Sequence, residues 1–143
     1  MKRAIVAILC AIIALLGTGV AHATEQPVFY VYFEQGSDQL TADGAQAINA
    51  MVARAKAAEA DLKAQSIPMR IVIVGYADRS GPAAYNIELS HRRAYKVAET
   101  LEGLGIPHDS LAVDWKGESM PKIETPDGAP EPQNRRVEIW PYF

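Results

Sequence analysis

The run Ile71-Val72-Ile73-Val74 most constrains the fold of this chain. It is continuously apolar and β-branched, and turn-forming residues follow it from Gly75. Such a run is typical of a strand rather than a helix, and alternation is missing because neither face meets water. We therefore expect a strand that is covered on both faces in the middle of a sheet.

The remaining pattern supplies elements on either side of this strand. An aromatic and β-branched strand is expected at 27–33, an amphipathic helix capped by Thr41 through about residue 64, and two half-buried strands around 111–115 and 137–139. A second helix precedes Gly103, and we expect it in two pieces with Ser90 as an N-cap. This βαβαββ order predicts an α/β (α+β) sandwich: one mixed sheet with two helices packed on one face, in one domain.

The first 23 residues have the pattern of a secretory signal peptide. Lys2 and Arg3 precede the uncharged apolar run 4–16, and Ala21-His22-Ala23 offers small residues for cleavage before Thr24. The alternative is an uncleaved membrane anchor, because residues 4–21 carry no charge and approach spanning length. Gly17-Thr18-Gly19 interrupts that stretch. We predict a signal peptide at 1–23, a domain at 24–143 and export through this signal peptide.

Composition excludes several classes of site. Cys10 is the single cysteine, it follows Leu9 rather than a small residue, and lipidation is not expected. A cleaved chain then lacks disulfides, iron–sulfur clusters and thiolate zinc sites. The net charge of −3 becomes more negative without Lys2 and Arg3, which argues against a nucleic-acid partner.

The sequence offers no recognisable catalytic or cofactor motif. It contains no Gly-x-Ser-x-Gly elbow, no Walker loop and no Gly-x-Gly-x-x-Gly. His91 and His108 are the histidines that remain after cleavage, and neither lies at metal-ligand spacing from a second ligand. We expect a non-enzyme that needs no cofactor or metal.

Residues 76–97 resemble the OmpA-like (OmpA/MotB C-terminal) peptidoglycan-binding domain. The matching positions are Asp78, Asn86, Leu89, Ser90, Arg93, Ala94 and Val97. Flanking matches at Phe33-Glu34 and Pro132 to Ile139 extend the resemblance over about residues 28–140. Two positions depart from the family pattern: Tyr76-Ala77 replaces His-Thr, and Glu34 replaces Asp.

The resemblance implies non-catalytic binding of diaminopimelate in the stem peptide of peptidoglycan. This side chain ends in an ammonium and a carboxylate on one carbon. By family position, Asp78 accepts from the ammonium, Arg93 clamps the carboxylate, and Asn86 holds the loop or the ligand. Arg136, and with less support Arg135, comes close to the site in relatives.

Physical arguments independent of the family point to the same pair of charges. Asp78 follows a buried strand in a turn-rich loop, where we expect a rigid but exposed carboxylate. Arg93 lies three residues after Ser90, so a helix N-terminus there would favour an anion. Taken singly, Asp78 is an ordinary turn residue and Arg93 belongs to a solvated helix face; their joint spacing favours a site.

Two other functions stay open. A protein–protein adaptor in the cell envelope would keep the fold with a weakened peptidoglycan site, as Ala77 suggests, and its partner would be an outer-membrane or other envelope protein. A cell-wall hydrolase is the least favoured, since no catalytic motif is present. After cleavage about three residues precede the first strand, so we expect no built-in tether and a soluble periplasmic protein or one held by a partner at the outer membrane.

Overall fold

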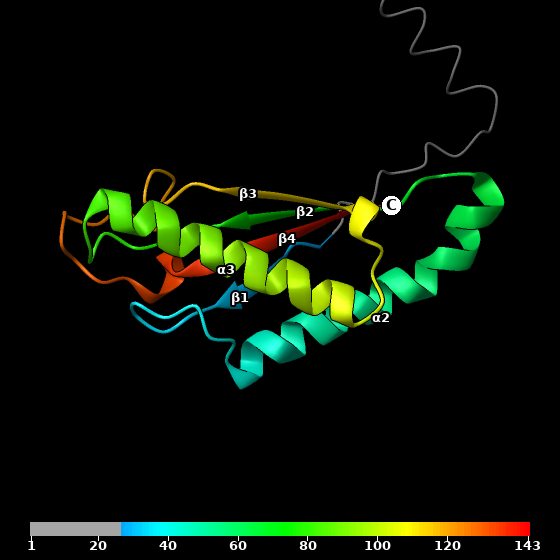
Figure 1. Ribbon diagram of the computed structural model, residues 1–143, viewed down its shortest axis with the longest axis horizontal. Helices are drawn as coiled ribbons and strands as arrows, with labels where there is room; N and C mark the ends of the chain where they lie inside the picture. Colours follow the sequence, from blue (N-terminus) through cyan, green and yellow to red (C-terminus); the bar gives the residue numbers. More distant parts are fainter. Residues whose placement is uncertain (1–26) are drawn as a thin grey trace, which may run out of the picture.

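The computed structural model describes residues 27–143, and the predicted signal peptide with Cys10 lies outside the described residues. Four strands and two long helices follow the predicted order (Figure 1). The elements are β1 (Phe29–Tyr32), α2 (Ala42–Gln65), β2 (Arg70–Gly75), α3 (Ala83–Gly103), β3 (Leu111–Trp115) and β4 (Arg136–Tyr142), with short 3-10 turns η1 (His108–Ser110) and η2 (Pro132–Asn134).

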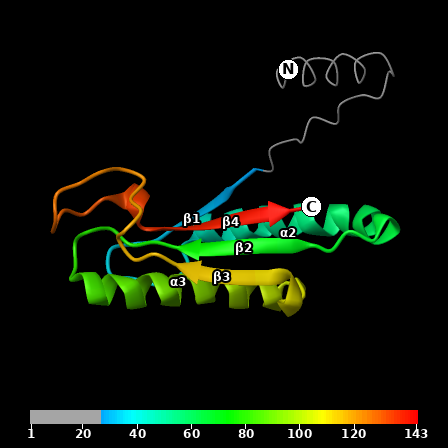
Figure 2. The same cartoon turned by 90° about the horizontal axis from the view of Figure 1, so that it is seen from above.

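The strands form one mixed sheet in the order β1-β4-β2-β3. β4 is antiparallel to both of its neighbours, whereas β2 and β3 are parallel and α3 connects them. Both helices lie on the same face of the sheet (Figure 2). The fold class is therefore confirmed, and β2 occupies the interior position that its apolar run predicts.

The expected cover on both faces of β2 is met in part, because Val74 is buried and Val72 is only half-buried on the face away from the helices. Ile71 and Ile73 face the helices and are fully buried. Val72 and Val74 point to the opposite face, where Trp140 and Glu138 of β4 are their cross-strand neighbours. Val72 stays half-buried there. Large neighbouring side chains, rather than a second layer of helices, shield this side of β2.

The core lies between the helices and the sheet. Every second residue of each strand points toward the helices and packs against one apolar stripe on each helix. This follows from the period of 2 residues in a strand and of 3.6 residues in a helix. The members that are fully buried are Val31, Ile48, Met51, Ala55, Ile71, Ile73, Ala94, Val97, Leu101, Val137 and Ile139. Thr41 caps α2 as predicted, with its hydroxyl accepting from the Gly44 amide at 3.0 Å.

The second helix is one continuous element, so the expected break with an N-cap at Ser90 was wrong. Ser90 is fully buried inside α3, where its hydroxyl donates to the Ile87 carbonyl at 2.8 Å and accepts from the Gly117 amide at 2.9 Å. A Cβ added at Gly75 would collide with the Ser90 carbonyl. The helix therefore packs directly on the end of β2, which only glycine permits.

Among the described residues, neither helix is long and apolar enough to cross a bilayer.

Three connections lie together at one end of the sheet: the β1–α2 loop, the β2–α3 loop and the long segment between β3 and β4 (Figure 1). This end carries the residues that the sequence singles out.

Candidate functional site

Four polar side chains, Asp78, Asn86, Arg93 and Arg135, are buried together at the loop end of the sheet and form what we call the polar cluster. Asp78 follows β2, Asn86 and Arg93 project from α3, and Arg135 immediately precedes β4. Buried polar groups need partners, so their bonds define what this cluster can do.

Asp78 is 4% exposed, so the expected solvent-exposed carboxylate was wrong. One of its oxygens accepts from the hydroxyl of Ser80 at 2.6 Å and from its amide at 3.3 Å. The other accepts from the Glu131 amide at 3.0 Å and from Nη1 of Arg135 at 3.1 Å. Burial alone would raise the pKa of Asp78, but the bonds from Ser80, Glu131 and Arg135 outweigh it and lower that pKa. The carboxylate therefore stays ionised.

Arg93 is fully buried in the middle of α3, not at a helix N-terminus as expected, because α3 begins at Ala83. Its guanidinium donates to three backbone carbonyls: Nε to Ser37 at 2.8 Å, Nη1 to Tyr76 at 3.1 Å and Nη2 to Glu34 at 3.0 Å. Burial lowers the pKa of Arg93 to about 10, partly opposed by the charge of Asp78. The group remains a cation at neutral pH.

Asn86 holds the β2–α3 loop. Its amide nitrogen lies 2.9 Å from the Asp78 carbonyl, 3.0 Å from the Gly81 carbonyl and 2.5 Å from a carboxylate oxygen of Glu118. Of the two roles expected for it, loop holding is the one that these contacts describe.

The structure brings Arg135, and not Arg136, into the polar cluster. Arg135 donates from Nε to the Phe33 carbonyl at 2.9 Å in addition to its ion pair with Asp78. Arg136 lies on the opposite face of the sheet, where it bonds Glu138 at 2.7 Å and stacks 3.8 Å from the centre of the Tyr76 ring. The alternation of side chains along a strand could have predicted this difference, because Arg135 lies an even number of residues from the core residues Val137 and Ile139 and so points to their side of the sheet.

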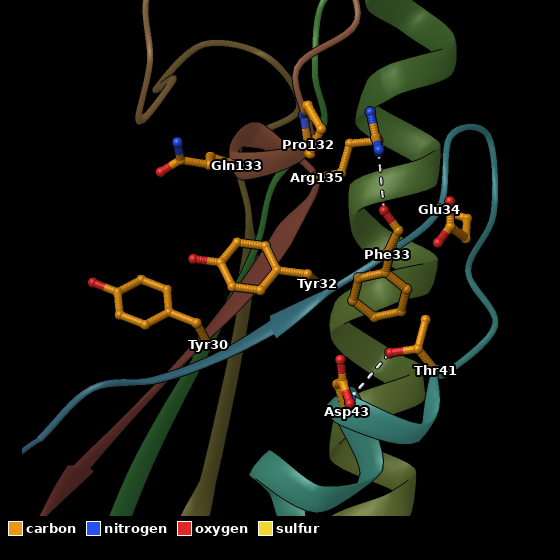
Figure 3. Close-up of a pocket in the computed structure, with 10 residues that line it drawn as sticks. Tyr30, Tyr32, Phe33, Glu34, Thr41, Asp43, Pro132, Gln133 and Arg135 are labelled. Atoms are coloured by element: carbon orange, nitrogen blue, oxygen red, sulfur yellow. Dashed lines mark hydrogen bonds between the residues drawn. The ribbon is translucent and has the colours of Figure 1, made fainter.

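A pocket of about 420 Å³ opens beside the cluster at the outer edge of β1 (Figure 3). We call it the edge pocket; it is lined by Tyr30, Tyr32, Phe33, Glu34, Thr41, Asp43, Gly44, Pro132, Gln133 and Arg135. Arg135 therefore contacts both features, through its ion pair with Asp78 and through this lining. Of the polar residues that line this pocket, sequence reasoning linked Glu34 and Arg135 to the site and Thr41 to the cap of α2.

Within residues 27–143, no group of three or more histidine, aspartate or glutamate side chains is placed to hold a metal ion. The polar cluster combines one carboxylate with two guanidinium groups instead. Such a set is suited to binding charged groups by directional hydrogen bonds.

Comparison with known proteins decides the family, since the model of the OmpA family matches residues 32–135. The chain belongs to the OmpA family. This OmpA-family chain is 35% identical over 122 residues to an outer membrane protein of Gluconacetobacter diazotrophicus, covering 81% of the chain and 30% of that protein. It is 39% identical over 70 residues to the peptidoglycan-associated lipoprotein of Legionella pneumophila, covering 49% of the chain and 40% of that protein.

The chain thus spans less than half the length of these curated relatives. Among solved structures, the peptidoglycan-associated lipoprotein from Burkholderia pseudomallei superimposes with a TM-score of 0.66 at 24% identity, covering 79% of this chain and 89% of that chain. This likeness confirms the OmpA-like fold.

Proposed function

We propose that this OmpA-family chain binds peptidoglycan without catalysis, through the diaminopimelate of the stem peptide, at the polar cluster. One observation carries the proposal: the charge of Arg93 has no bonded carboxylate. Within residues 27–143, Arg93 donates only to neutral carbonyls and makes no ion pair, while Asp78 is paired with Arg135. The cluster therefore has one positive charge in excess.

A buried cation without a bonded anion is costly, and a ligand carboxylate would relieve that cost. Two of the carbonyls that Arg93 bonds, those of Glu34 and Ser37, belong to the β1–α2 loop. A guanidinium has five N–H donors, of which three are used here. A small movement of this loop would expose the remaining donors to a carboxylate in bidentate geometry.

Asp78 is the group that fits the ligand ammonium. Its oxygens already accept four bonds, so an incoming ammonium must replace one of the present donors. We assign that exchange to the Ser80 hydroxyl, which can rotate away, whereas the Glu131 amide and Arg135 are fixed by the backbone and by the Phe33 carbonyl. The pair Asp78 and Arg93 then recognises both charges of an amino-acid zwitterion.

The names of the relatives support an envelope location. One is an outer membrane protein and others are peptidoglycan-associated lipoproteins. We place this chain in the periplasm with peptidoglycan as its partner, in contact with the outer membrane or not. The proposed role needs neither metal nor cofactor.

The test is co-sedimentation with purified sacculi, with meso-diaminopimelate as the competing ligand. Asp78→Asn keeps the size of the side chain and removes its charge, and Arg93→Lys keeps the charge and removes the fork. Arg92→Lys is the matched control, because Arg92 is the exposed neighbour that bonds Asp38 across the surface. Circular dichroism establishes that each variant is folded.

We expect wild type and Arg92→Lys to sediment and to be released by meso-diaminopimelate. Loss of one partner of a buried charge pair costs about 2–5 kcal/mol, so Asp78→Asn should bind about 30-fold more weakly or worse. Arg93→Lys keeps its charge but loses the bidentate geometry, and it should also bind more weakly. Sedimentation that meso-diaminopimelate does not compete, or that folded Asp78→Asn retains in full, would overturn the proposal.

A further inference from the structure

The edge pocket has a chemical character different from that of the polar cluster. Tyr30 and Tyr32 supply two rings whose planes differ by 13° and whose centres lie 6.1 Å apart. The Lys122 ammonium, which is not among the lining residues, holds these rings from outside the pocket: it lies 4.2 Å from the Tyr30 ring centre and donates to the Tyr32 hydroxyl at 3.2 Å. The two rings are thus nearly parallel and are held by Lys122 before any ligand arrives.

The backbone of β1 adds hydrogen-bonding groups to the same pocket. β1 is an edge strand, and in residues 27–143 its sole sheet neighbour is β4. The Phe33 amide donates to the Arg135 carbonyl, next to β4, at 3.0 Å. In an antiparallel pair, every second residue of a strand bonds its partner and the residues between them point their amides and carbonyls the other way. The amide and carbonyl groups of Tyr32 and Tyr30 therefore point outward, toward the side on which the pocket opens.

The charges around the pocket favour an uncharged ligand over an anion. Glu34 and Asp43 are exposed carboxylates, and neither forms an ion pair with another described residue. The positive charge of Arg135 is already paired with Asp78. Carboxylates and the Gln133 amide accept from hydroxyl groups, so the walls suit a polyhydroxylated molecule.

From these features we infer that the edge pocket binds an N-acetylated sugar unit of the glycan strand. One side of such a ring is lined by C–H groups and packs on aromatic surface, its hydroxyls donate to carboxylates, and its acetamido group matches outward-facing backbone groups. The pocket volume of about 420 Å³ suits a ligand of this size. This inference rests on the proposed function, because the glycan strand and the stem peptide would then occupy adjoining sites that meet at Arg135.

The experiment uses two probes on the same protein. NMR titration with tri-N-acetylchitotriose, which has the sugar and lacks the stem peptide, reports on the edge pocket. Titration with meso-diaminopimelate reports on the polar cluster. The variant is Tyr32→Ala, since Tyr32 is 39% exposed and its removal does not open the core. Tyr142→Ala is the control, because Tyr142 is 54% exposed near the end of β4 and does not line the pocket.

We expect chitotriose to shift amide resonances of residues 30–34, 43 and 133 in wild type and Tyr142→Ala. Tyr32→Ala should bind it about tenfold more weakly, the scale of one lost aromatic contact, with meso-diaminopimelate binding unchanged. Absent or scattered shifts, or equal chitotriose affinity in Tyr32→Ala, would refute the sugar site. Failure of the peptidoglycan proposal would appear separately, as an absent response to meso-diaminopimelate.

Discussion

Replacing Arg93 with lysine tests whether one side chain fixes the loop end of the molecule. The guanidinium joins α3 to carbonyls of Glu34 and Ser37 in the β1–α2 loop and of Tyr76 after β2, at 2.8–3.1 Å. A lysine ammonium is a compact point charge on a flexible stem and cannot span three acceptors in two separate segments. We expect it to keep one of these bonds.

The magnitude follows from the two bonds that are lost. A hydrogen bond to a charged group contributes about 1.5–3 kcal/mol, so two of them represent about 3–6 kcal/mol. Water that enters the vacated space can donate hydrogen bonds to some of the carbonyls that lose Arg93. We therefore expect a net loss of about 2–4 kcal/mol in the free energy of unfolding. For a domain of this size that lowers the Tm by about 10 °C.

Urea unfolding followed by circular dichroism measures this loss. Arg92→Lys provides the comparison, because its exposed ion pair with Asp38 contributes less than about 1 kcal/mol. The reasoning is refuted if Arg93→Lys and Arg92→Lys unfold at the same urea concentration. In that case the three bonds of Arg93 contribute nothing net to stability.

Three further changes probe the same end of the fold. Gly75→Ala should destabilise the domain by about 1–3 kcal/mol or prevent folding, because its Cβ would collide with the Ser90 carbonyl; thermal melting checks this. Because the pKa of Asp78 is lowered in the folded state, its carboxylate stabilises the fold above the unfolded pKa of about 3.9. This stabilisation is lost as pH falls through the folded pKa. Below about pH 4 the Tm of wild type should therefore fall more steeply than that of Asp78→Asn. Asn134→Ala removes three bonds to Lys122 and Ile123, so limited proteolysis should cut the segment between β3 and β4 faster than in wild type.

Element order and core parity follow from local pattern, which is why the sequence predicts them. Thr41 as a cap and the inward parity of Ile71, Ile73, Val137 and Ile139 depend only on neighbours in the chain. The error at Ser90 arose because serine is a good cap and also a tolerated buried residue when its hydroxyl is bonded. Here that bond comes from Gly117, 27 positions away, which local pattern does not reveal.

For the candidate site, the sequence predicted which residues come together but not that they are buried. Asp78, Asn86 and Arg93 were predicted because family spacing marks them, and the structure brings them together. Their burial was missed, because Asp78 is enclosed by Glu131 and Arg135 and Arg93 by Glu34 and Ser37. Those contacts depend on how three loops pack against one another in space, which the order of residues along the chain does not reveal.

The bonds of the polar cluster also set when in folding a binding site can exist. Arg135 reaches back 102 positions to the Phe33 carbonyl and 57 positions to Asp78, and Arg93 reaches 59 positions to Glu34. Contacts of such long sequence separation require the closure of long loops, which costs chain entropy. A chain that lacks β4, or has not yet docked it, therefore presents neither the paired carboxylate nor the complete edge pocket. Both proposed sites therefore require that β4 is docked between β1 and β2.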